Sequence, residues 1–137
     1  MKKHLFIAFV ALPFFLNAQN QSSITSKPED EIRQYFFVML LDGKNRSQDS
    51  VTTAKIQESH MANINRLYYE GKLKVAGPFG ENGNWKGIFI FDCATKEEVD
   101  TILQTDPAVK SGRLAYEIKP WYTAAIGSFV TGKPRKN

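Results

Sequence analysis

Cysteine and histidine are scarce in this chain of 137 residues, which contains one cysteine and two histidines. The single cysteine, Cys93, excludes an intrachain disulfide and leaves a buried thiol, an intermolecular bridge or a reactive group. Burial is the favoured interpretation, because Cys93 directly follows the apolar run 88–91. His4 falls in a segment expected to be removed, so His60 would be the only histidine of the mature chain. Neither a metal nor another cofactor is therefore expected.

Long apolar runs are also missing. The run 5–16 is shorter than the roughly 20 residues needed to cross a bilayer, and a polar segment follows it at once. It is preceded by the basic residues of segment 1–4 and ends in Leu16-Asn17-Ala18, a small-residue cleavage site. These features predict a signal peptide over residues 1–18 rather than an uncleaved anchor. We expect an exported protein, periplasmic or secreted, without stable membrane insertion after cleavage.

The sequence has little excess of basic charge. Its formal net charge is +4, which falls to +2 when Lys2 and Lys3 leave with the signal peptide. The remaining excess lies in the C-terminal tail, and no basic stripe interleaved with aromatic residues is present, so nucleic acid is not expected as a partner. Walker, dinucleotide-binding and Ser/His/Asp signatures are absent as well, so no motif in the sequence indicates nucleotide binding or hydrolysis by a catalytic triad.

The mature chain suits one domain, since 42% hydrophobic residues can build a core without disulfides or metals. Polar residues dominate 19–33 and predict a flexible leader. The domain is expected over residues 34–123. Residues 124–137 would form a C-terminal extension with the basic tail.

Four segments have the composition and patterning of β-strands. The first is a continuous apolar and aromatic run, YFFVMLL, and the last, LAYEIKPW, alternates apolar with polar residues up to Pro120. The second and third flank a glycine-rich turn and predict an antiparallel hairpin, with Gly77-Pro78 ending the second strand. The predicted strands cover residues 35–41, 73–76, 85–91 and 114–121.

The first helical segment carries a histidine on its apolar stripe. Ile56, His60 and Ile64 recur at four-residue spacing, and Gly71 is placed to end the helix. The polar segment 42–50 before this helix is long enough to lie over the mouth of a site, or to be a simple surface loop.

A second helix is expected to begin at a capping box formed by Thr95 and Glu98 and to end at Asp106-Pro107. The element order is then β α β β α β. This order predicts an α+β, ferredoxin-like fold, in which two helices cover one face of a four-stranded antiparallel sheet and the other face needs a partner.

Five pieces of sequence occur in a fixed order across residues 34–123: YFFVMLL, SHMANINRL, EGKLKVAGP, QTDPAVKSG and EIKPW. In this combination the chain resembles the YciI-like (YCII-related) family of small ferredoxin-like domains, also called dimeric α/β barrels. The resemblance implies a homodimer packed sheet against sheet. It also implies an active-site dyad, which falls on His60 and Asp106, but no particular reaction. Ala108 stands where the family often has a bulky aromatic residue, so a wider or differently shaped pocket is expected.

The chemistry of such a dyad is simple. A carboxylate that accepts one ring N–H of a histidine fixes the tautomer and raises the basicity of the ring, so the other nitrogen can exchange a proton. Taken alone, His60 on an apolar stripe is more often a satisfied core residue, and an aspartate such as Asp106 before a proline is usually turn chemistry.

The wall of the predicted pocket is assigned to Gly77 and Pro78, because glycine allows a close backbone approach to a substrate. A bend that only ends a strand is the alternative. Trp85, Tyr116 and Trp121 are further candidates for lining an apolar cavity, or for the core and the dimer interface.

The sequence therefore suggests an exported enzyme of isomerase or lyase type. His60 would act as general acid or base, and Asp106 would orient it toward an unknown small molecule. The alternative is a non-catalytic ligand-binding or interaction domain, favoured by the lack of a second catalytic group and by the open sheet face.

Overall fold

The computed structural model of the protein describes residues 32–124. The predicted signal peptide, most of the predicted leader and nearly all of the C-terminal extension lie outside the described residues. The chain runs through β1 (Arg33–Asp42), α1 (Ser50–Tyr69), β2 (Leu73–Pro78), β3 (Trp85–Phe91), α2 (Lys96–Leu103), α3 (Pro107–Lys110) and β4 (Leu114–Thr123).

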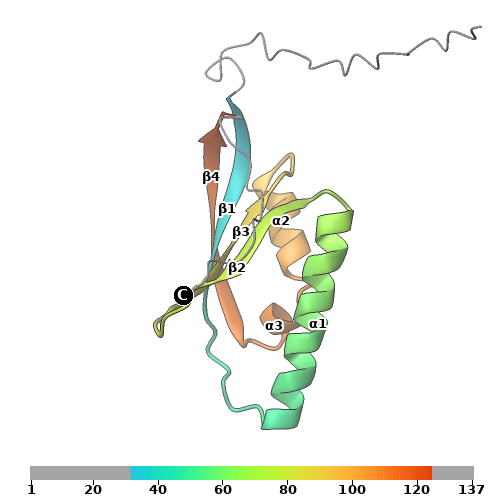
Figure 1. Cartoon of the computed structure of the whole chain (residues 1–137), viewed down its shortest axis with the longest axis vertical. Coiled ribbons are helices and arrows are strands. Elements are labelled where there is room, and N and C mark those ends of the chain that lie inside the picture. The colour runs from blue at the N-terminus through green and yellow to red at the C-terminus, as the bar shows by residue number, and fades with distance from the viewer. Residues whose placement is uncertain (1–31, 125–137) are drawn as a thin grey trace, which may run out of the picture.

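The four strands form one antiparallel sheet in the order β2-β3-β1-β4. All three helices lie on the same side of this sheet, with the long α1 beside the short α3 (Figure 1). The predicted α+β, ferredoxin-like fold is confirmed. None of the helices between residues 32 and 124 has the length and apolar character needed to cross a membrane.

Two strands are longer than predicted. Gly77 and Pro78 continue β2, where they pair with Ile88 and Gly87 of β3, so the prediction of a break after residue 76 was wrong. Pro120 lies inside β4 rather than at its end. Both prolines are tolerated because β2 and β4 are the edge strands of the sheet, where a missing N–H breaks no ladder bond if it faces outward.

The predicted helix boundaries are mostly correct. Gly71 has a φ of 72°, the left-handed conformation expected just after α1. Thr95 caps α2 by accepting a hydrogen bond from the Glu98 amide at 3.1 Å. A capping box would also place the Glu98 carboxylate on the backbone N–H of Thr95. In the structure this carboxylate instead accepts a hydrogen bond from the Ala94 amide at 2.9 Å and pairs with Lys72.

The helix α3 is absent from the predicted order. Asp106 is its N-cap and accepts a hydrogen bond from the Ala108 amide at 2.8 Å, and Pro107 occupies the first turn. The prediction treated Asp106-Pro107 only as the end of the preceding helix. The same pair is also a favoured helix start, and four residues are too few to show a helical period.

The core lies between the helices and the sheet and is closed by aromatic and aliphatic side chains from both. Val38 and Phe91 of the central strands and Val99 of α2 are fully buried. Cys93 borders this core but is only half-buried, so the prediction of a buried thiol was partly wrong. Burial still raises the pKa of its thiol to about 11, which makes it a poor nucleophile near neutral pH.

On the opposite face of the sheet, residues 32–124 place no helix, and the strands β1, β2 and β3 carry apolar side chains there. Phe37 lies opposite Ile90, and Met39 lies opposite Ile88, with Val75 of β2 beside Ile90. These five side chains, called the open face below, are only partly buried. The described part of the chain therefore leaves an apolar surface uncovered at the centre of its sheet.

Candidate active site

The Asp106 carboxylate is the most completely enclosed polar group of the site, with 1% of the residue exposed. It accepts hydrogen bonds from the Asn63 side chain at 3.0 Å and from the Ala108 amide at 2.8 Å. The His60 Nδ1 atom lies 2.9 Å and 2.8 Å from its two oxygens. Three donors from two helices thus fix the position of this carboxylate.

The pKa of the Asp106 carboxyl reflects two opposing causes. Burial acts to raise it, but the hydrogen bond and the charge of His60, followed by the hydrogen bonds from Asn63 and the Ala108 amide, hold the pKa below the ordinary value of 3.8. Asp106 is therefore ionised at neutral pH and can only accept hydrogen bonds. Consequently the Nδ1 atom of His60 carries a proton.

His60 is 7% exposed and projects from α1 toward the sheet. Its ring stacks against Phe89 of β3, with centroids 6.1 Å apart and an interplanar angle of 26°. One ring nitrogen is held by Asp106, whereas no hydrogen bond to the other, Nε2, is found within residues 32–124. Because His60 also lines a cavity, Nε2 is the atom available to a bound molecule.

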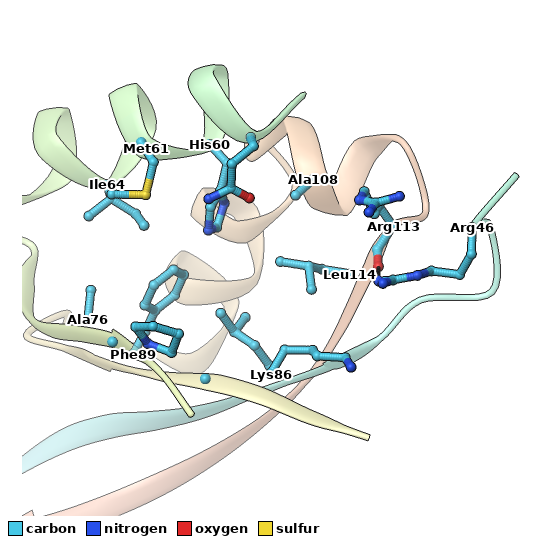
Figure 2. Close-up of a pocket in the computed structure, with 15 residues that line it drawn as sticks. Arg46, His60, Met61, Ile64, Ala76, Lys86, Phe89, Ala108, Arg113 and Leu114 are labelled. Atoms are coloured by element: carbon cyan, nitrogen blue, oxygen red, sulfur yellow. Dashed lines mark hydrogen bonds between the residues drawn. The ribbon is translucent and has the colours of Figure 1, made fainter. Parts of the chain in front are cut away.

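That cavity has a volume of about 320 Å³, large enough for a small organic molecule. It lies between α1 and the sheet, and the stacked side chains of His60 and Phe89 both line it (Figure 2). Met61 and Ile64 line one end. The lining residues are Leu40, Arg46, Gln57, His60, Met61, Ile64, Ala76, Gly77, Pro78, Lys86, Gly87, Phe89, Ala108, Arg113 and Leu114.

Three of the four residues predicted for the site, His60, Gly77 and Pro78, line this cavity, whereas Asp106 binds His60 Nδ1 and is not among the lining residues. His60 and Asp106, 46 positions apart in sequence, form the predicted pair, and Gly77 and Pro78 are part of the wall. Ala108 also lines the cavity. The contact required by the dyad hypothesis is present, while the catalytic role of His60 and Asp106 stays a prediction.

The three aromatic candidates lie elsewhere. Trp85 is 60% exposed and Trp121 is 41% exposed. Tyr116 donates a hydrogen bond to Asp100 at 2.7 Å and accepts one from Gln104 at 2.6 Å. None of them lines the cavity beside His60. Successive side chains of a strand point to opposite faces of the sheet, and these three lie on the other face or at another end of the sheet.

Sequence reasoning missed the residues that complete the site. Asn63 lies one turn after His60 on α1, so its spacing signals that both side chains can reach one carboxylate. Arg46 and Arg113 reach the cavity from two different loops, and Lys86 comes from β3. Residues from separate loops carry no shared spacing in the sequence, and only the fold brings them together.

The polar loop before α1 does border the cavity. The Gly43 amide donates to the Arg113 carbonyl oxygen at 3.0 Å, and the Asn45 amide donates to the Gly112 carbonyl oxygen at 3.0 Å. A Cβ atom on Gly43 would lie 2.1 Å from that Gly112 oxygen, so only glycine permits this approach. The loop is thereby fastened to the start of β4, which places Arg46 at the cavity.

Within the described part of the chain, no cluster of three or more histidine, cysteine or acidic side chains could hold a metal ion.

Three comparisons place the chain among known proteins. A family model described as a YCII-related domain matches residues 35–122. A search of curated proteins found no match. Among solved structures, the chain is similar to the 5-chloro-2-hydroxyhydroquinone dehydrochlorinase TftG from Burkholderia phenoliruptrix AC1100, in complex with 2,5-dihydroxybenzoquinone. That match has a TM-score of 0.50 and 21% identity, and it covers 64% of this chain and 92% of the dehydrochlorinase. It supports the fold.

Proposed function

Since the chain belongs to the YCII-related domain family, we propose that it is a small exported enzyme in which His60 performs acid-base chemistry on a small molecule. The observation that carries this proposal is the buried pair of His60 Nδ1 and Asp106, which leaves Nε2 directed at a cavity. A ring nitrogen that faces a cavity can exchange a hydrogen bond or a proton with a molecule bound there.

The proposed mechanism needs one proton carrier. The Nε2 lone pair accepts a proton from an acidic C–H or O–H of the substrate, and the ionised Asp106 stabilises the imidazolium that forms. The same Nε2–H then returns the proton to another substrate atom, which gives isomerisation, or to a departing group, which gives a lyase reaction. Asp106 acts as a positioning residue, since His60 separates it from the substrate.

A search for the substrate can begin with hydroxylated aromatic compounds and quinones, the compound class in the description of the structurally similar dehydrochlorinase. The test is a screen of such compounds against the wild type and His60→Gln. Conversion by the wild type but not by the variant supports the proposal, and equal conversion by both would refute it.

The second candidate function is ligand binding without turnover. It is favoured by the cavity lining, which among the described residues contains no carboxylate, hydroxyl or thiol that could serve as a second catalytic group. A compound that binds beside His60 and is recovered unchanged would favour this function over an enzyme.

We also propose that the protein is a homodimer joined through the open face. An apolar patch on the three strands β1, β2 and β3 is expected to be covered, and the sheet-to-sheet arrangement implied by the family resemblance covers it with a second copy. Sedimentation is expected to show a dimer at micromolar concentration for the wild type and a monomer for Phe37→Glu. Tyr69→Glu, at a position on α1 that is 85% exposed, is the control and should remain dimeric. A monomeric wild type would contradict the proposal.

Export is proposed from residues 1–18, whose pattern is that of a signal peptide. In a host that exports the full-length chain, intact-mass measurement is expected to find a product beginning at Gln19 outside the cytoplasm. Recovery only in the cytoplasm with residues 1–18 attached would exclude this localisation.

A further inference from the structure

The cavity beside His60 is chemically asymmetric. One end is lined by Met61, Ile64 and Ala76, and the other by the cationic side chains of Arg46 and Lys86 together with Arg113 (Figure 2). Of the 15 lining residues these three carry positive charge, and none is acidic. We call Arg46, Lys86 and Arg113 the cationic end.

One carboxylate lies beside the cationic end. Asp42 pairs with Arg46 at 2.8 Å and with Lys86 at 2.9 Å. The hydrogen bond from Lys86 is the largest cause that lowers the pKa of the Asp42 carboxyl, so Asp42 is ionised at neutral pH. Within residues 32–124, three cations therefore face a single anion, and the cationic end keeps an excess of positive charge.

The three cations also retain donors for a ligand. Within residues 32–124, Lys86 Nζ donates to the Gly83 carbonyl oxygen in addition to Asp42. Among the partners that the described residues offer, Arg46 and Arg113 each use only Nη1. Arg46 donates to Asp42 and to the Arg113 carbonyl oxygen, and Arg113 donates to Gln48. A guanidinium has five N–H donors, and its planar fork matches the two oxygens of a carboxylate.

We propose that the cavity takes a small aromatic or unsaturated carboxylate, whose carboxylate group binds the cationic end while its flat apolar part lies between Phe89 and the side chains of Met61 and Ile64. His60 lines the stretch between these two ends, so the substrate atom nearest its Nε2 lies between the carboxylate and the apolar part. Only the proton transfer at this substrate atom rests on the proposed function. The carboxylate preference is a property of binding and is separable from turnover.

A matched pair of compounds tests the preference. 4-Hydroxybenzoate and 4-hydroxybenzamide have nearly the same shape and differ in charge, and their Kd values can be measured by NMR titration of the wild type. We expect the carboxylate to bind at least about 10-fold more tightly at low salt, with shifts at residues that line the cavity. The preference is expected to be lost in Arg46→Gln and in Lys86→Gln. Lys96→Gln, which removes the same charge from an exposed position at the start of α2, should keep it.

The outcomes separate this inference from the proposed function. Equal affinity for the two compounds, binding of neither at millimolar concentration, or an equal loss in Lys96→Gln would each overturn the carboxylate preference. His60→Gln is expected to keep the preference, since His60 is outside the cationic end. If the wild type prefers the carboxylate but His60→Gln converts the substrate as well as the wild type does, the acid-base proposal fails and the inference on the ligand class stands.

Discussion

Replacing His60 with glutamine is expected to lower the turnover of the substrate by about 100- to 10,000-fold, the usual contribution of a positioned general acid or base. Glutamine fills much of the same space and is a good helix former, so α1 should persist. Its amide cannot accept and return a proton at neutral pH, however. The measurement is kcat for a compound that the wild type converts, together with the thermal unfolding temperature of both proteins.

The control for this experiment is Asn65→Ala, an exposed position on the same helix that is remote from the cavity lining. It should leave kcat unchanged. A His60→Gln variant that is folded and keeps wild-type turnover would show that His60 is a structural residue after all. A variant that loses binding and turnover together would show that the ring of His60 acts by contacting the ligand and not by carrying the proton.

The second large effect is expected on stability. Asp106→Ala should lower the free energy of unfolding by about 3 kcal/mol at neutral pH, because His60, Asn63 and the Ala108 amide all lose a buried, charged acceptor. Chemical denaturation of the wild type and the variant measures this difference. Glu58→Ala, an exposed acidic position on α1, is the matched control and should change stability by less than about 0.5 kcal/mol.

The cost of Asp106→Ala should also depend on pH. The folded-state pKa of Asp106 lies below its ordinary value of 3.8, so the ionised group contributes stability above the unfolded-state pKa. That contribution is lost as the pH falls through the folded-state pKa. The stability gap between the wild type and Asp106→Ala should therefore be constant at neutral pH and narrow below about pH 4. A gap that does not change on acidification would show that the ionised carboxylate contributes nothing beyond its shape.

Much of the fold was predictable because it depends on patterns of residues that are close together in the sequence. The strands follow from apolar runs bounded by glycine and polar residues, and the caps at Gly71 and Thr95 follow from backbone preferences that act within a few residues. The errors arose where local rules have two meanings. Asp106-Pro107 can end one helix or begin the next, and Pro78 and Pro120 are compatible with a strand once that strand lies at the edge of the sheet.

The site was predictable only in part. The His60 and Asp106 pair came from the family resemblance, since a histidine on an apolar stripe is by itself an ordinary core residue. The sequence by itself determined the helix that carries His60, the alternation that leaves one sheet face apolar, and the pattern of a signal peptide. These properties depend on residues close together in the chain.

Only the tertiary structure decided which side chains share the cavity. His60 contacts the Asp106 carboxylate through Nδ1, and Arg46, Lys86 and Arg113 lie together at one end of the cavity. Trp85 and Trp121 are not among the lining residues. The physical reason is that these contacts join separate loops, strands and helices, whose distances are set by how the sheet packs against α1 and α3. No spacing within the sequence encodes such a distance.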